Sequence, residues 1–421
     1  MFKVLDIKNI ILSSKDGKVL FANFGYLSLL QIAGYIFPLI TIPYLARVIG
    51  VEGFGKIAFA SSVIIWFQTI ADWGFNYTAT RDVAKNRDDI ARVTKIFSSV
   101  FWARCILMIG SLIILLLLVL LIPIFKENTA VILVTFLMIP GYIMFPDWLF
   151  QAMERMKYIT MLNIMSKALF TVAVFLFVRD KSDYLLQPLL VSCGYILSGV
   201  VAFYYIRRIW GIKLKKVSFN EIFETIKNSS DVFLNNLMPN LYNSFSTMLL
   251  GIVGGPSSNG LYDAGCKFIN IAQQFMQVIS RTFFPFLSRK IEKHHVYVVI
   301  NIVFAVMASM MLFLLSPVLI KLLFTSEFFP AIKVMRIMSI SIFFLMLSDV
   351  YGTNYLIING SERILRNVTI ICSLIGFALS FPLIHCYDYI GAALTVTITR
   401  GMLGICSMFF AKRSAYGKLV K

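Results

Sequence analysis

Six polar side chains recur at helical spacing inside an otherwise apolar stretch, residues 259–289. Successive members lie four, three, four, three and four residues apart, so on an α-helix they form one stripe about 80° wide. Between the first and the last, a helix rises about 27 Å, close to the thickness of a bilayer's hydrocarbon core. Lipid offers such a stripe no partner, so we expect a transmembrane helix whose stripe lines a substrate passage. The stripe consists of Asp263, Lys267, Asn270, Gln274, Gln277 and Arg281.

Polar residues in two other apolar stretches are candidates for the same passage. Asparagine is a poor contact for lipid and usually turns towards other helices. Three alternatives stay open. The asparagines could only join helices by hydrogen bonds, and Arg47 could reach the lipid headgroups. Asp263 and Lys267 of the stripe could simply neutralise each other. The candidates are Asn236, Asn240 and Asn243 on one face of residues 231–253, and Gln31, Tyr35 and Arg47 in or at the end of residues 21–46.

Five other charged side chains stand out within apolar stretches. Each costs on the order of 2.5–3.5 kcal/mol at the centre of a membrane helix and so needs an explanation. Three are carboxylates near the cytoplasmic ends of their predicted spans. They could bind a proton or a cation, or they could form gate salt bridges with Arg or Lys of the loops. Two are cations midway along their stretches; a structural role is open for both, and Arg400 is also a candidate for coupling or gating. They are Asp72, Asp147 and Asp349, and Lys167 and Arg400.

The composition is that of an α-helical membrane protein. Of 421 residues, 59% are hydrophobic and 14% charged, whereas a soluble protein of this size needs far more polar surface. Apolar runs of about 20 residues recur, and the alternating segments of a β-barrel are missing. The net charge of +18 is explained by Lys and Arg in short cytoplasmic loops, so no nucleic-acid partner is implied. Six scattered cysteines without a CxxC pair, and only three His, indicate neither disulfides nor a metal site.

Twelve membrane spans can be placed along the chain. Lys and Arg concentrate in the termini and in the loops after even-numbered spans, which predicts that both termini are cytoplasmic. The longest loop, 207–230, separates an N-terminal lobe (21–206) from a C-terminal lobe (231–411). Residues 1–20 are predicted to be an amphipathic cytoplasmic segment, and 412–421 a cytoplasmic tail. The spans are 21–46, 54–77, 97–122, 130–151, 158–179, 186–206, 231–253, 260–284, 296–320, 331–358, 366–385 and 389–411.

The two lobes carry matching glycine turns. At an offset of 205 residues Gly50 matches Gly255 and Gly55 matches Gly260, each pair between two predicted helices. Because six spans is an even number, both lobes start on the same side of the membrane and the repeat is parallel. The prediction is therefore an all-α membrane protein of two six-helix lobes, related by a parallel pseudo-repeat and facing each other across a central cavity.

Motifs for enzymatic chemistry are missing. The sequence has no P-loop GxxxxGK[ST], and neither a DxD-type cluster nor a Ser/His/Asp constellation stands out. A transporter without its own ATPase must draw on an ion gradient, the membrane potential or the substrate gradient. We therefore expect a protein that is not an enzyme and binds no cofactor, with H+ or Na+ as candidate coupling ions.

Three stretches carry a resemblance to a known family: YLARVIGVEGFGKIAFA (44–60), PDWLFQAMERMKYIT (146–160) and GLYDAGCKFINIAQQF (260–275). They resemble the polysaccharide-export flippases of the Wzx (O-antigen flippase) type, in the multidrug/oligosaccharidyl-lipid/polysaccharide exporter superfamily. The likeness covers the whole chain in length, span number and predicted cytoplasmic termini. It implies a multi-pass protein of the bacterial inner membrane, in which helices 1, 2, 7 and 8 line a cavity that opens alternately to either side.

The resemblance also implies a substrate and partners. The substrate would be an oligosaccharide repeat unit on undecaprenyl diphosphate, moved from the cytoplasmic to the periplasmic leaflet for O-antigen or similar polymer. A polysaccharide polymerase and a chain-length regulator would be partners. Cations suit the anionic diphosphate, and amides suit sugar hydroxyls. Drug exporters of the superfamily often have an acidic residue in the first helix; residues 21–46 have none, so proton coupling through that site does not carry over.

Two other functions stay open from the sequence. A cation-coupled drug or metabolite exporter would share the fold, although a cation exporter would want a more acidic cavity than this one. A membrane enzyme such as a polysaccharide polymerase would want a sizeable periplasmic catalytic loop, and the predicted loops on that side are short.

Overall fold

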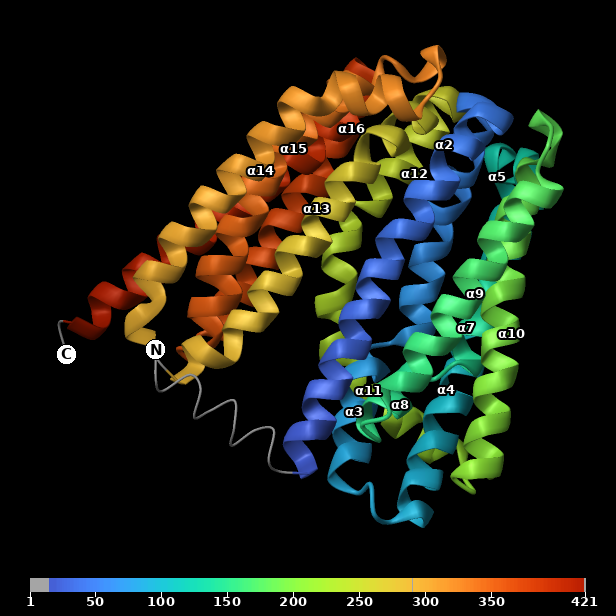
Figure 1. Ribbon diagram of the computed structural model, residues 1–421, viewed down its shortest axis with the longest axis vertical. Coiled ribbons are helices and arrows are strands. Elements are labelled where there is room, and N and C mark those ends of the chain that lie inside the picture. Colours follow the sequence, from blue (N-terminus) through green and yellow to red (C-terminus); the bar gives the residue numbers. More distant parts are fainter. Residues whose placement is uncertain (1–14, 290, 420–421) are drawn as a thin grey trace. The chain divides into compact units, whose positions relative to one another are not determined.

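The computed structural model describes residues 15–289 and 291–419, and the regular structure in these two ranges is entirely helical (Figure 1). The prediction of an all-α protein is confirmed. The α-helices are α2 (Lys15–Asp72), α3 (Phe75–Lys85), α4 (Ile90–Leu121), α5 (Pro123–Glu127), α6 (Thr129–Phe136), α7 (Met138–Met144), α8 (Asp147–Ala152), α9 (Met156–Phe177), α10 (Leu186–Ile209), α11 (Phe219–Leu237), α12 (Ser244–Val253), α13 (Gly255–Arg289), α14 (His294–Leu323), α15 (Ala331–Ser348) and α16 (Glu362–Leu419). Short 3₁₀ segments are η1 (Lys181–Leu185), η2 (Met238–Leu241), η3 (Ile291–Lys293) and η4 (Ser326–Phe328), and η5 (Asp349–Ile357) is a π-helix.

Eight helical stretches among the described residues are long and apolar enough to cross a membrane. Two of them contain a break, α2 at Gly50 with a φ of 67° and α16 at Asp388 with a φ of 52°, so each accounts for two spans. The break at Asp388 falls in the predicted gap between the last two spans. The predicted seventh and eighth spans lie in α11–α12 and in α13, whose polar stripe lowers its hydropathy. The architecture therefore agrees with twelve spans.

The chain divides into two compact units. Unit 1 contains the described residues up to Tyr44 together with residues 67–234, and unit 2 contains residues 45–66 together with the described residues from Asn235 onward. This division differs from the predicted lobes, because the second half of α2 groups with the C-terminal half of the chain.

Close packing of the two glycine turns explains why residues 45–66 belong to unit 2. A side chain at Gly55 would overlap the carbonyl of Pro256, and one at Gly260 would overlap the carbonyl of Val51. Only glycine allows backbones to approach this closely. The turn in α2 is therefore fixed to the start of α13.

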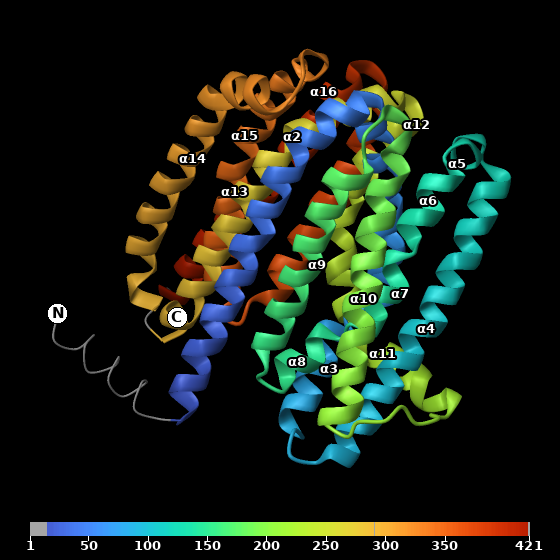
Figure 2. The same cartoon turned by 45° about the vertical axis from the view of Figure 1, so that its right-hand side comes forward.

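Unit 1 is built around a buried aromatic core. Phe97 of α4 packs near Trp148 of α8, with 6.4 Å between ring centroids, and both are almost completely buried. Helix α10 packs along α7 and α9, and α3 packs on α8 (Figure 2). Gly141 and Gly199 bring α7 and α10 together, since a Cβ at either would meet the opposing helix within 3 Å.

The segment between α10 and α11 is fixed to unit 1. The backbone N–H of Lys215 donates to Ser98 Oγ at 3.0 Å, and Trp102 Nε1 donates to the carbonyl of Lys215 at 3.0 Å. Lys95 forms an ion pair of 2.5 Å with Glu221. This hydrogen bond to the ammonium holds the pKa of the Glu221 carboxyl below its usual value.

The prediction of a loop over 207–230 needs a correction, because helix α11 begins at Phe219. Ile222 and Ile226 lie four residues apart and pack against the core of unit 1, which gives this segment an amphipathic helical pattern. Helix α16 continues to Leu419 and so includes most of the segment 412–421 that is predicted to be a cytoplasmic tail. Of the predicted amphipathic segment 1–20, residues 1–14 lie outside the described residues.

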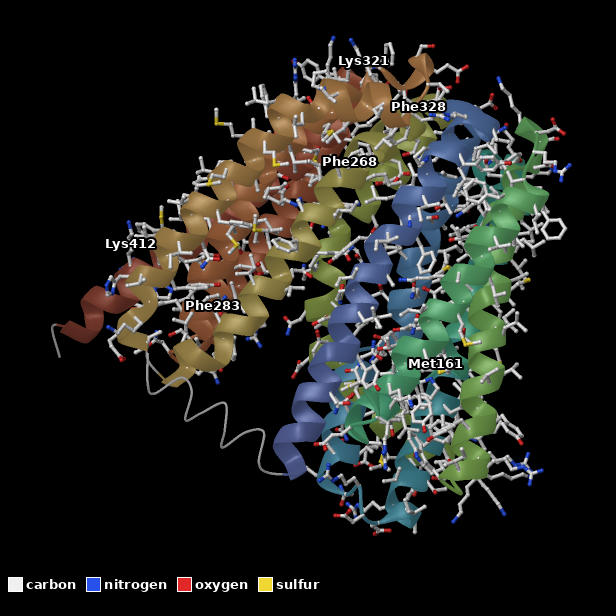
Figure 3. All side chains as sticks on the ribbon, in the orientation of Figure 1. Met161, Phe268, Phe283, Lys321, Phe328 and Lys412 are labelled. Atoms are coloured by element: carbon white, nitrogen blue, oxygen red, sulfur yellow. The ribbon has the colours of Figure 1, made fainter. Side chains whose placement is uncertain are left out.

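In unit 2, α15 lies against α13, α14 and α16. Phe328 of η4 is fully buried, and its ring meets the ring of Phe54 edge-on at 5.7 Å between centroids. Figure 3 shows Phe328 and Lys321 towards one end of this unit and Phe283 towards the other. The Phe54 contact joins the second half of α2 to the C-terminal helices.

Candidate functional site

Asp263 and Lys267, at the start of the predicted polar stripe, form an ion pair on α13. The Lys267 ammonium lies 2.6 Å from the Asp263 carboxylate, and the side chains are 30% and 23% exposed, respectively. The same ammonium lies over the Phe54 ring, 5.4 Å from its centroid. The pairing that the sequence left open as an alternative is therefore present. Both side chains remain accessible enough to meet a ligand.

The stripe continues along the side of α13 that faces away from the core of unit 2. Asn270 and Gln274 are exposed and Gln277 is half-buried, whereas Ile269 and Met276 on the other side are buried. Arg281 lies on the same helix, but its side chain is outside the described residues. An apolar helix that turns amides away from its own core needs other protein, water or a ligand opposite them.

Arg400 occupies the buried centre of unit 2 and is only 3% exposed. Its guanidinium donates from Nη1 to Ser341 Oγ at 3.0 Å. From Nη2 it donates to Gln273 Oε1 at 2.9 Å and to Asn243 Oδ1 at 3.4 Å. No carboxylate of the described ranges lies within 4.0 Å of it. Because arginine keeps its proton, the unit buries a cation that neutral oxygens alone solvate.

Gln273 and Ser341 are partners of Arg400 that the sequence reasoning missed. Gln273 precedes the stripe residue Gln274 and therefore projects about 100° away from it, outside the predicted stripe. The sequence does contain a signal for the role of Gln273, which is that it stands next to Gln274. Two adjacent amides cannot share one narrow helical face, so one of them must point away from the stripe. A serine in a membrane helix gives no comparable signal, because small residues are common at helix contacts.

The predicted seventh span is not one continuous α-helix, and that part of the prediction needs a correction. The 3₁₀ turn η2 interrupts the helix around Pro239, which has no N–H to continue the helical hydrogen bonds. Asn236 is half-buried before the interruption, and Asn240 lies within it. Asn243, just before α12, accepts a hydrogen bond from Arg400 Nη2 at 3.4 Å.

The candidates of the predicted first span fall into different units. Gln31 and Tyr35 are in unit 1, where the Tyr35 hydroxyl lies 3.5 Å from Gln31 Oε1. Arg47 is exposed and belongs to unit 2, although it lies on α2 just before the break at Gly50. The structure therefore does not gather these three residues within one unit.

Asp72 pairs with an arginine of another span, not with a loop residue as the gate alternative expected. Arg104 of α4, 1% exposed, donates from Nη2 to the Asp72 carboxylate. Asn76 bridges the pair, since its Nδ2 donates to Asp72 Oδ2 at 2.9 Å and its Oδ1 accepts from Arg104 at 3.0 Å. Asn76 Nδ2 also lies 3.0 Å from the Tyr142 hydroxyl. This network is a buried polar centre in unit 1.

Asp147 adds a second carboxylate to this centre. Its Oδ1 accepts the backbone N–H of Trp148 at 2.8 Å at the start of α8. It lies close enough to Arg104 and Asp72 to interact with both electrostatically. Two carboxyl groups therefore share the field of one guanidinium.

Asp349 starts the π-helix η5 at the end of α15, and its carboxylate is half-buried. The buried amide of Asn354 lies 3.3 Å from the carbonyl oxygen of Asp349. The same amide nitrogen lies 2.7 Å from Ser280 Oγ and 3.0 Å from the Tyr297 hydroxyl. These contacts join α13, α14 and η5. π-Helical turns are frequent at functional sites, and here the turn aims an amide into the interior.

Comparison with known proteins adds a family to this geometry. Residues 20–291 match the family described as "Polysaccharide biosynthesis protein". A protein of Escherichia coli (strain K12), provisionally named an O-antigen transporter, is 28% identical over 400 residues, which cover 93% of this chain and 96% of that protein. A Shigella dysenteriae protein with the same provisional name is 24% identical over 90% of this chain and 97% of its own. The family resemblance found in the sequence is confirmed.

Solved structures share the fold at low sequence identity. The lipid II flippase MurJ in an inward closed conformation matches with a TM-score of 0.73 and 14% identity, over 93% of this chain and 87% of MurJ. A mutant of the Vibrio cholerae MATE transporter VcmN matches with a TM-score of 0.58 and 13% identity, over 95% of this chain and 97% of that protein. The fold is therefore that of membrane transporters.

Proposed function

The chain belongs to the polysaccharide biosynthesis protein family, and on that premise we propose that it is a flippase for lipid-linked oligosaccharides. The observation that carries the proposal is the match over nearly the full length of both chains to a protein named for O-antigen transport. The fold shared with a lipid II flippase supports the same class of cargo.

The substrate that we propose is an oligosaccharide repeat unit on undecaprenyl diphosphate, moved from the cytoplasmic to the periplasmic leaflet of the inner membrane. The sugar and diphosphate cannot cross hydrocarbon without partners, whereas the prenyl chain can stay in the bilayer. Alternating access would expose one polar passage first to one side and then to the other. The product would feed surface polysaccharide assembly, with a polymerase and a chain-length regulator as partners.

Helix α13 supports this proposal best, because its polar face carries both kinds of group that the substrate needs. Lys267 can meet a phosphate oxygen, since the ion pair with Asp263 leaves it part-exposed. Asn270 and Gln274 are exposed and offer both donors and acceptors to sugar hydroxyls.

For energy coupling we propose the polar centre of unit 1. Asp72 and Asp147 share one arginine, so this centre can gain a proton or a Na+ ion more easily than the cationic centre of unit 2. A cation taken up here would make the cycle an antiport.

A second candidate is a drug or metabolite exporter, since the fold is also that of MATE transporters. Arg400 speaks against a cationic cargo, because it lies in the centre of unit 2 with no carboxylate within 4.0 Å among the described residues. Drug resistance on overexpression, with unchanged surface polymer in a deletion strain, would favour this candidate.

Deletion of the gene tests the flippase proposal. Cells should lose surface polysaccharide and accumulate the undecaprenyl-diphosphate-linked repeat unit in the inner membrane, accessible only from the cytoplasmic side in inverted vesicles. A plasmid copy should restore the polymer. Normal polymer in the deletion strain would contradict the proposal.

A further inference from the structure

Lys167 is a membrane-embedded cation for which the described part of the chain shows no hydrogen-bonding or ionic partner. It lies midway along α9, which runs from Met156 to Phe177, and is half-buried. Its Cα is about 15 Å from either end of the helix, whereas its four-carbon stem reaches roughly 6 Å. The ammonium therefore cannot reach the lipid headgroups from this position.

Three other cations within the spans have protein partners, whereas Lys167 has none among the described residues. Arg104 is bound by Asp72 and Asn76, Lys267 by Asp263, and Arg400 by three neutral oxygens. Among residues 15–289 and 291–419, no group lies within hydrogen-bonding distance of the Lys167 ammonium, and no carboxylate lies within 4.0 Å of it. An unpaired charge at this depth is among the most costly features that a membrane helix can carry.

Lys167 extends from α9 towards a glycine of α2. Its Nζ lies against Gly34 of α2, at 3.5 Å from where a Cβ would stand, so the ammonium is at contact distance from the backbone of α2. Gln31 lies one turn before Gly34 on the same face of α2 and is half-buried. Helices α2 and α9 are joined near the start of α9, where the Thr160 hydroxyl donates to the carbonyl of Tyr26 at 2.9 Å.

We infer that Lys167, between α2 and α9, is an anion-binding position for a phosphate of the lipid-linked substrate. This inference rests on the proposed function and adds a contact in unit 1 to those on α13. A phosphate ester supplies the charge that the site lacks, and its remaining oxygens can accept from the Gln31 amide. A chain that keeps its prenyl tail in the bilayer can bring such a phosphate to this depth.

Ligand-dependent thermal stability of the full-length protein in detergent tests the inference. The probes are farnesyl diphosphate, farnesol and inorganic pyrophosphate. Farnesyl diphosphate should raise the unfolding temperature of the wild type, and farnesol should not. In Lys167→Met the half-maximal concentration should rise at least tenfold, and in Lys167→Arg it should stay within threefold. The matched control is Lys157→Met, since Lys157 is exposed on the same helix.

A second variant protects the test against a folding defect in Lys167→Met. Gly34→Val keeps the lysine but places two further methyl groups against its ammonium, and should weaken the response to farnesyl diphosphate at least fivefold. Its control is Gly25→Val on the same helix, where a Cβ would meet nothing within 4 Å. A wild-type response in both Lys167→Met and Gly34→Val would overturn the inference.

Two further outcomes would also overturn the inference. If pyrophosphate binds as tightly as farnesyl diphosphate, the position takes phosphate from solution and the lipid-linked assignment is wrong. If the wild type responds to neither probe, the inference fails. The proposed function stands or falls separately, on whether the wild-type gene restores surface polymer in the deletion strain.

Discussion

Gly55 and Gly260 hold two turns of the chain together by reciprocal contacts. A Cβ added at Gly55 would stand 1.6 Å from the carbonyl oxygen of Pro256, and one added at Gly260 would stand 2.1 Å from that of Val51. Val51 and Pro256 are separated by the same 205 residues as the two glycines. Each turn therefore offers the other a glycine and a carbonyl, as in a two-fold symmetric contact.

Substitution of either glycine should separate the turns. Neither Gly55→Ala nor Gly260→Ala can be relieved by a side-chain rotation, because the obstructing atoms are backbone. We expect each to cost about 1–3 kcal/mol of unfolding free energy and to lower the unfolding temperature of the purified protein. Gly110→Ala is the control, since a Cβ there meets nothing within 4 Å and alanine favours a helix. Equal stability of the three variants would contradict the contact.

The periodicity of side chains was enough to predict several of these elements. Helical spacing fixes both the existence of α13 and its polar face, so the stripe from Asp263 onward needed no tertiary information. The matching glycines likewise indicated two equivalent turns. Contacts between distant helices were out of reach, because Arg400 and Gln273 are 127 residues apart and no local pattern relates them. Pro239 lies inside the predicted seventh span and could mark a kink, but the proline alone did not predict a break, since membrane helices often tolerate proline.

Lys267→Ala should block transport without unfolding the protein. The ion pair with Asp263 is part-exposed, so its loss should cost no more than about 1 kcal/mol. Surface polymer should nevertheless fall at least tenfold at normal protein level, because the ammonium would meet the substrate phosphate. Arg47→Ala should act in the same way. The control is Lys56→Ala, which removes the 2.7 Å pair with Glu52 at the same spacing. Normal polymer in Lys267→Ala would remove Lys267 from the mechanism.

Asp72 and Arg104 should behave as one unit in a double-mutant cycle. Asp72→Asn leaves a guanidinium that is 1% exposed without its carboxylate, and we expect a loss of about 3–5 kcal/mol. The double variant Asp72→Leu/Arg104→Met removes both charges and should be more stable than Asp72→Asn. Thermal unfolding of both, and of the single variants Asp72→Leu and Arg104→Met, completes the cycle. If the losses from the single variants simply add in the double variant, the pair is not coupled.

Replacement of Arg400 should impair transport without lowering the stability of the protein. Its charge is buried against three neutral oxygens, so Arg400→Gln removes an uncompensated cation and leaves an amide that can pair with the same groups. We expect an unfolding temperature equal to or above that of the wild type, because relief of the buried charge offsets the lost hydrogen bonds. Surface polymer should fall at least tenfold, since a costly charge that does not stabilise the fold is retained for transport. Arg400→Lys should preserve part of the activity. An Arg400→Gln protein that is strongly destabilised would instead show that the guanidinium is a structural link between α13, α15 and α16.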